Sequence, residues 1–378
     1  MSGFSPEQIE IISHTIGFGL FGLVFSLALT PVVSFFLYRL KVWRKNGEID
    51  PTLGIDGRSG KAHTPIMGGL IVILSVALIT FFWNWDRQFT WVPIGGMMIS
   101  AVLGAFDDLF SIIGRKRRDR SLRQTLTLIR VHKNFLARIW YVITIPWVAF
   151  KSFATAFGSK RGMGVHAHEK LLLQFIAGAI AALWIYGKLG ETWKEIKIPF
   201  DGFLNIGAWI IPLIIVVVMF TANAVNISDG MDGLAGGMLI PAFTALSFLS
   251  AIFGYGELAI LNAVTAGALV TYTFFNVKPA RFQMGDVGSL ALGTLLAINA
   301  SAINAMAILP FVAFMFYVEA FSVVIQVIGR VIFGRRIFKM APLHHHFELL
   351  GWSEEKTIMR FWVVQLAFVL IGIWIALH

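Results

Sequence analysis

Four short clusters of polar side chains interrupt an otherwise strongly apolar chain. They are Asp107 and Asp108 in "GAFDDLF"; Asn226, Asp229 and Asp232 in "NAVNISDGMDGLAGG"; Asp286 in "FQMGDVGSLALGT"; and His344, His345 and His346 in "MAPLHHHFELLGW". Carboxylates gathered in one place repel one another unless a cation lies among them, and all-oxygen ligands favour a hard ion such as Mg²⁺. Because Mg²⁺ commonly binds through one or two carboxylates plus substrate phosphates, the clusters predict a magnesium-dependent site for a phosphate substrate.

Membrane-spanning helices must bring these clusters together. The 378-residue chain is 57% hydrophobic and 14% charged, with a mean hydropathy of +0.75. Apolar runs of about 20 residues, the length that crosses a bilayer core, recur along it. They predict about ten transmembrane helices, at 14–38, 66–85, 90–108, 170–188, 206–225, 233–253, 258–276, 287–304, 306–332 and 357–377. Since these runs are continuously apolar rather than alternating, we expect an all-α polytopic integral membrane protein.

Basic residues indicate the side of the membrane on which each connecting segment lies. Most of the 31 Lys and Arg residues follow the first, third, seventh and ninth expected helices. Cytoplasmic segments retain such residues, so both termini are expected to be extracytoplasmic. All four clusters follow odd-numbered helices, which predicts one active-site cleft on the cytoplasmic face. The net charge of +10 then belongs to that face and suits membrane lipid or a phosphorylated ligand, with no nucleic acid as partner.

Each cluster also has a purely structural interpretation. An Asp pair can end a helix in solvent, Asp229 and Asp232 can be turn residues among glycines, and Asp286 can be a helix N-cap. The three histidines could be an exposed loop or a transition-metal site, although adjacent imidazoles rarely reach one ion. None of these interpretations explains why all four clusters fall on the same expected face.

With "KAHTPIMGG" (61–69) and "RIFKMAPLHHHFELLGW", these motifs resemble those of the bacterial phospho-N-acetylmuramoyl-pentapeptide transferases, in the polyprenyl-phosphate N-acetylhexosamine-1-phosphate transferase superfamily. The resemblance implies a multi-pass enzyme of the bacterial cytoplasmic (inner) membrane. It would transfer phospho-MurNAc-pentapeptide from UDP-MurNAc-pentapeptide to undecaprenyl phosphate, giving lipid I and UMP, the first membrane step of peptidoglycan biosynthesis. It also implies a single transmembrane transferase domain over 1–378, Mg²⁺ as cofactor and a homodimer.

The resemblance further implies roles for individual residues. Asp286 would bind Mg²⁺, with Asp107 and Asp108 as catalytic partners. Whether Asp107 acts as a base or positions phosphate stays open, because phosphate is mostly ionised at neutral pH. Substrate binding would fall to Lys61, Thr64, Lys170, Asn226, Asp229, Asp232, His344, His345 and His346. Glu319, in the ninth expected helix, matches a family acid and is expected to pack or bend that helix.

Two motifs depart from the family pattern. The aromatic residue that usually precedes Met-Gly-Asp and stacks on uracil is Gln283 here, with Phe282 one position earlier. How uracil is held therefore stays open. In the first motif, His63 and Ile66 replace the usual Gly and second Thr, so the family pattern there transfers only to Lys61 and Thr64.

A basic insert at about 111–165 is the third departure. Its apolar run "FLARIWYVITIPWVAFKSFATAF" (135–157) could be an eleventh span. A crossing there would place Asp286 and the histidines on the face opposite Asp107, so we expect an interfacial or re-entrant cytoplasmic element instead. Trp140, Tyr141 and Trp147 are its expected interfacial anchors.

Three other functions share some of these sequence features. A sister polyprenyl-phosphate N-acetylhexosamine-1-phosphate transferase using another UDP-sugar would fit the insert and the missing aromatic residue. A membrane transporter could also hold acids within its spans, but here the acids gather at one face rather than along a pathway. A non-catalytic lipid-binding relative is disfavoured because Asp107, Asp108, Asp232 and Asp286 are all present.

Overall fold

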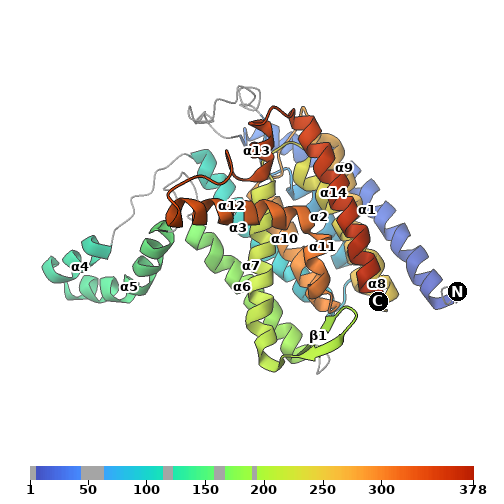
Figure 1. Cartoon of the computed structure of the whole chain (residues 1–378), viewed down its shortest axis with the longest axis horizontal. Coiled ribbons are helices and arrows are strands. Elements are labelled where there is room, and N and C mark those ends of the chain that lie inside the picture. The colour runs from blue at the N-terminus through green and yellow to red at the C-terminus, as the bar shows by residue number, and fades with distance from the viewer. Residues whose placement is uncertain (1–5, 44–63, 114–121, 157–166, 190–193) are drawn as a thin grey trace.

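The computed structural model describes residues 6–43, 64–113, 122–156, 167–189 and 194–378, and within them the chain is mostly helical (Figure 1). The helices are α1 (Pro6–Arg39), α2 (Leu70–Trp83), α3 (Trp91–Ile113), α4 (Leu122–Val131), α5 (Phe135–Ala156), α6 (Ala167–Lys188), α7 (Ile210–Ser228), α8 (Leu234–Ile252), α9 (Gly256–Asn276), α10 (Gly285–Ala302), α11 (Leu309–Val312), α12 (Phe314–Ile332), α13 (Leu343–Glu348) and α14 (Glu354–Ala376). Short 3₁₀ turns cover Gly207–Trp209 and Met306–Ile308.

Eight of the described helices are long and apolar enough to cross a membrane, which makes this a polytopic membrane protein. They are α1, α3, α6, α7, α8, α9, α12 and α14. Ten spans were expected, and the other two expected positions hold α2, which has 14 residues, and α10, which has 18. The first described turn of α1 and the C-terminus lie at the same end of the bundle, opposite α13 (Figure 1).

Helix α10 is enclosed by protein, which explains its composition. Every residue from Gly285 to Ala302 except Asp286 is buried, and α10 packs against α3, α7 and α6. A helix that faces other helices rather than lipid uses small residues that allow close approach. A Cβ added at Gly293 would lie 2.7 Å from the Cα atom of Ala222 on α7, so only glycine fits there.

Helix α1 packs along α9 through a similar glycine contact. A Cβ at Gly22 would lie 2.6 Å from the carbonyl oxygen of Val264, and a Cβ at Gly267 would overlap the carbonyl oxygen of Gly19. The first and seventh expected helices therefore become neighbours although they are more than 200 residues apart in the sequence.

The ninth expected helix, 306–332, is broken at Ala313. Helix α11 ends at Val312, and α12 then crosses the bundle at a steep angle to α7 and α14 (Figure 1). The buried side chain of Gln365 on α14 compensates for the lost helical bonds. Its amide donates to the Val312 carbonyl (2.5 Å) and accepts from the Met315 N–H (2.9 Å). A helix can break at membrane depth when a neighbouring helix satisfies the freed backbone groups in this way.

The fold is not entirely α-helical, which corrects the expectation of an all-α protein. Strands β1 (Glu195–Ile198) and β2 (Gly202–Asn205) form an antiparallel hairpin between α6 and α7. Pro199 and Phe200 (φ 66°) make the turn, closed by a bond from the Asp201 N–H to the Ile198 carbonyl (3.2 Å). The eight residues of the two strands contain no long apolar run, so the pattern that predicted the spans did not predict this hairpin.

Candidate active site

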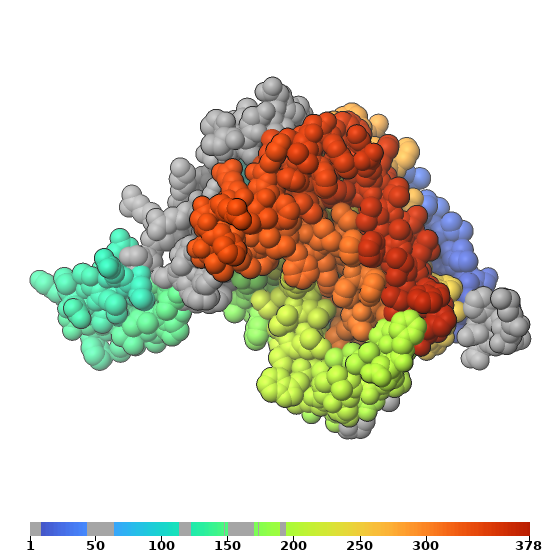
Figure 2. All heavy atoms as spheres, viewed as in Figure 1, coloured from blue at the N-terminus to red at the C-terminus, as the bar shows by residue number. Residues whose placement is uncertain are grey.

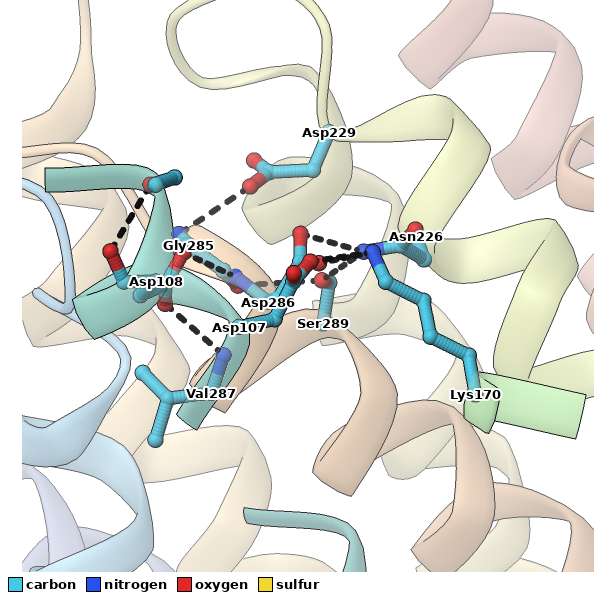
Figure 3. A network of polar contacts seen from close by, with 10 residues as sticks. Asp107, Asp108, Lys170, Asn226, Asp229, Gly285, Asp286, Val287 and Ser289 are labelled. Atoms are coloured by element: carbon cyan, nitrogen blue, oxygen red, sulfur yellow. Dashed lines mark hydrogen bonds and ion pairs between the residues drawn. The ribbon is translucent and has the colours of Figure 1, made fainter. Parts of the chain in front are cut away.

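Lys170 lies where α3, α6 and α10 meet (Figure 3). Its ammonium group is 2.5 Å from Oδ2 of Asp107 and forms a second ion pair with Oδ2 of Asp286. The three side chains are between 13% and 21% exposed, so the ion pairs are shielded while the group stays accessible. The cation that two converging carboxylates require is supplied by the protein itself.

An amide and a hydroxyl fix the other side of Asp286. Nδ2 of Asn226, near the end of α7, donates to Oδ1 of Asp286 (2.9 Å) and to Oγ of Ser289 (2.9 Å). Asp286 therefore has one oxygen toward Lys170 and the other toward Asn226 (Figure 3). Groups held on three separate helices are rigidly placed, as a phosphate-handling site requires.

Two further aspartates hold the beginning of α10 instead of joining the ion pair. Asp108, 1% exposed, accepts from the N–H groups of Asp286 (3.3 Å) and Val287 (3.1 Å). Oδ2 of Asp229 accepts from the N–H of Gly285 (3.2 Å). These carboxylates, which belong to other elements, cap the first N–H groups of α10. The side chain of Asp286 is therefore not needed as the N-cap of α10 and can take part in the site.

Asp232 lies on the other side of the same loop, toward α14. Its N–H donates to Oε1 of Glu354 (3.4 Å), and its Oδ2 accepts from the N–H of Ala280 (3.4 Å). Glu354 also pairs with Lys278 (3.1 Å). These contacts join the 229–233 loop to the segment before α10 and to the first turn of α14.

The three histidines lie next to one another in the short helix α13, and each has its own partner. Nδ1 of His344 is 3.1 Å from Oε2 of Glu319, and Nδ1 of His345 is 2.6 Å from Oε2 of Glu348. Nδ1 of His346 accepts from the N–H of Lys339 (3.1 Å). His344 is 1% exposed and faces Gly230, where an added Cβ would lie 2.5 Å from its Nε2. The histidine helix thus packs against the loop that carries Asp229.

The first motif is described only in part. Lys61 and His63 lie outside the described residues, whereas Thr64 is half-buried and Ile66 is buried. The carbonyl of Pro65 accepts from the N–H of Gln283 (2.8 Å), which places this motif beside the segment that leads into α10. Phe282 is 1% exposed and its ring packs against Tyr272 and Phe275, so it does not replace the missing aromatic residue.

Known proteins share these features over most of the chain. Residues 162–304 match the family model described as glycosyl transferase family 4. A phospho-N-acetylmuramoyl-pentapeptide-transferase of Chloroflexus aurantiacus is 34% identical over 329 residues, 84% of this chain and 78% of the relative. Transferases of the same name from Ruegeria pomeroyi (32%; 87% of this chain, 85% of the relative) and Halalkalibacterium halodurans (30%; 98% of each) are also similar. The chain belongs to the phospho-N-acetylmuramoyl-pentapeptide-transferase family.

The oxygen donors suit the metal that this transferase family implies. Asp286, Asp107 and the side-chain oxygen of Asn226 are hard ligands of the type that Mg²⁺ prefers. Among the described residues no group of three or more His, Asp or Glu side chains could hold a metal ion by itself.

Several partners in this site were not predicted from the sequence. Ser289 lies three residues after Asp286, on the same side of α10, and that spacing could have identified it. Glu348, three residues after His345, was visible in "HHHFE" for the same reason. Asn276, which accepts from the Gly233 N–H (2.8 Å), gave no local signal because its partner is 43 residues away.

Proposed function

We propose that this chain transfers phospho-MurNAc-pentapeptide from UDP-MurNAc-pentapeptide to undecaprenyl phosphate, giving lipid I and UMP. Relatives named for this activity match the chain over 78–98% of their own length. The supporting observation within the molecule is Lys170, which is ion-paired to Asp107 and Asp286 from two other helices. This cluster combines a cation with anionic oxygens, the equipment needed to hold phosphates against one another.

The reaction joins two phosphates. An oxygen of undecaprenyl phosphate forms a bond to the sugar-bearing phosphorus of the UDP-sugar, and the bond from that phosphorus to UMP breaks. Little covalent work falls to the protein, so positioning and charge neutralisation supply the catalysis. A lysine ammonium suits this task as a compact point charge.

Each member of the cluster has a distinct part. Asp286, fixed by Asn226, would hold Mg²⁺ with the substrate phosphates, and this ion would neutralise charge on the phosphate oxygens. Lys170 contacts phosphate when substrate draws it from the carboxylates. Asp107 orients Lys170 and positions the lipid phosphate rather than removing a proton, because that phosphate is already ionised at neutral pH.

We further place the protein in the bacterial cytoplasmic membrane as a homodimer, with α13 and the Lys170 cluster on the cytoplasmic side. The first described turn of α1 and the C-terminus lie at the end of the bundle opposite α13 (Figure 1). A reporter fused after His378 should therefore be extracytoplasmic. A cytoplasmic reporter would reverse this orientation.

The test is UMP release by the purified protein with undecaprenyl phosphate, Mg²⁺ and either UDP-MurNAc-pentapeptide or UDP-GlcNAc. We expect release with the first substrate only, its loss with EDTA and its return with Mg²⁺. Release with UDP-GlcNAc alone would instead establish a sister transferase. Lys170→Met should lower kcat about 10²–10³-fold, as removal of a transition-state charge partner does. Lys188→Met, at the exposed far end of the same helix, is the matched control and should keep full activity.

A further inference from the structure

Helices α4 and α5 form an antiparallel pair that projects from one side of the bundle (Figures 1 and 2). The turn between them is closed by Arg138, whose guanidinium group donates to the carbonyls of His132 (2.7 Å) and Arg130 (3.1 Å). His132 in addition packs its ring against Tyr141 (5.7 Å). The pair is therefore a built element with defined inner and outer sides.

The outer side of α5 is apolar. Its exposed residues up to Ile143 other than Arg138 are Phe135, Leu136, Ile139, Trp140, Val142 and Ile143. At 3.6 residues per turn they fall on one side of the helix, with Arg138 at its border. Leu136 is 73% exposed and Trp140 64%. An apolar face this continuous marks a surface made for an apolar partner.

Helix α4 is more polar and more basic than this face. Four of its six exposed positions are polar (Arg123, Gln124, Thr127 and Arg130) and two are apolar (Leu126 and Val131), while Leu122, Leu128 and Ile129 are partly buried. From 122 to 156 the sequence has five Lys and Arg residues and no Asp or Glu. The pair thus has an apolar outer face on α5 and a mainly polar, basic exposed side on α4.

We propose that this pair lies in the plane of the membrane surface, with the α5 face in the acyl region and α4 toward anionic lipid headgroups. A helix with one apolar and one basic side binds a lipid surface in this orientation. Of the three expected anchors, Trp140 lies on the lipid-facing side, whereas Tyr141 is half-buried against His132. The side chain of Trp147 lies outside the described residues.

Because the chain contains no cysteine, single spin labels can test this in the full-length protein in nanodiscs containing phosphatidylglycerol. Ile139→Cys and Ile143→Cys report on the α5 face, and Arg123→Cys and Thr127→Cys report on α4. All four positions are exposed on the protein, so burial within the chain does not separate them. We expect the first two labels to be more accessible to oxygen than to a water-soluble nickel chelate, and the last two to show the reverse.

Other outcomes would overturn the proposal. Chelate access at Ile139 and Ile143 would place the face in water, and oxygen preference at all four positions would place both helices inside the bilayer. Spin–spin broadening that falls on dilution with unlabelled protein would identify a second copy as the occupant. In nanodiscs of phosphatidylcholine alone, the oxygen preference at Ile139 should decrease. An unchanged oxygen preference would mean that anionic lipid does not contribute to the binding of the pair. Gel filtration of each variant checks that it is folded.

Discussion

Glu319 and His344 form a buried pair, 0% and 1% exposed, that joins α12 to α13. Oε2 of Glu319 lies 3.1 Å from the imidazole Nδ1, and Oε1 accepts from the backbone N–H of His344 (3.0 Å). Sequence analysis expected His344 to contact the nucleotide-sugar. That contact stays a prediction, and in the structure the imidazole lies between Glu319 and Gly230, where it packs α13 against the loop that carries Asp229.

Replacing Glu319 should therefore loosen α13. Glu319→Ala leaves a buried N–H and imidazole without their acceptor, at a cost of about 1–3 kcal/mol in unfolding free energy. Glu319→Gln keeps one acceptor for the His344 N–H and should cost less. Thermal unfolding of the purified variants measures the difference. Equal losses for Ala and Gln would mean that the backbone bond contributes little.

Gly230→Ala tests the coupling of α13 to the site directly. The added Cβ would lie 2.5 Å from Nε2 of His344, so the imidazole or the loop must move. We expect kcat to fall at least about tenfold, corresponding to a barrier change of about 1.4 kcal/mol, with a smaller effect on KM. Gly256→Ala is the matched control, because nothing lies within 4 Å of its added Cβ. Equal kinetics for the two variants would separate α13 from catalysis.

The approach of α3 to α10 depends on Gly104. A Cβ there would overlap the backbone of Asp286, which cannot yield as a side chain can. Gly104→Ala should lower the unfolding free energy by about 1–3 kcal/mol or more and abolish UMP release. Gly95→Ala, on the same helix, has nothing within 4 Å of its added Cβ and should be neutral or stabilising. Unfolding temperatures of both variants in the same detergent test this prediction, and equal temperatures would contradict it.

Lys278 gives a pH dependence with a definite sign. The hydrogen bonds that its ammonium donates to Glu355 (2.8 Å) and Glu354 (3.1 Å) raise its pKa above 10.5. A raised lysine pKa contributes stability that is complete below the unfolded-state pKa and is lost as pH rises through the folded-state pKa. Lys278→Met should therefore lower stability equally across neutral pH, by about 1 kcal/mol or less for so exposed a pair. The difference from the parent protein should shrink above pH 10.5, and a difference that grows with pH would contradict the assignment.

Much of the architecture could be predicted from local sequence. Long apolar runs predicted the spans, because crossing a bilayer needs about 20 apolar residues whatever lies beside them. The same rule was less suited to α10, whose small and polar residues face protein on all sides. It also treated 306–332 as one helix, since the group that permits the break at Ala313 is Gln365, some 50 residues later.

The candidate site divides in the same way. Residue types, and the position of each cluster after an odd-numbered span, identified Asp107, Asn226, Asp286 and the histidines as candidate site residues. Charge is costly within a membrane and tends to mark function. Only the tertiary structure decided their parts. Asp286 and Asp107 share the ammonium of Lys170, Asp108 caps α10, and His344 turns inward to Glu319. Hydrogen bonds and ion pairs act over about 3 Å, and which groups come that close depends on how distant helices pack.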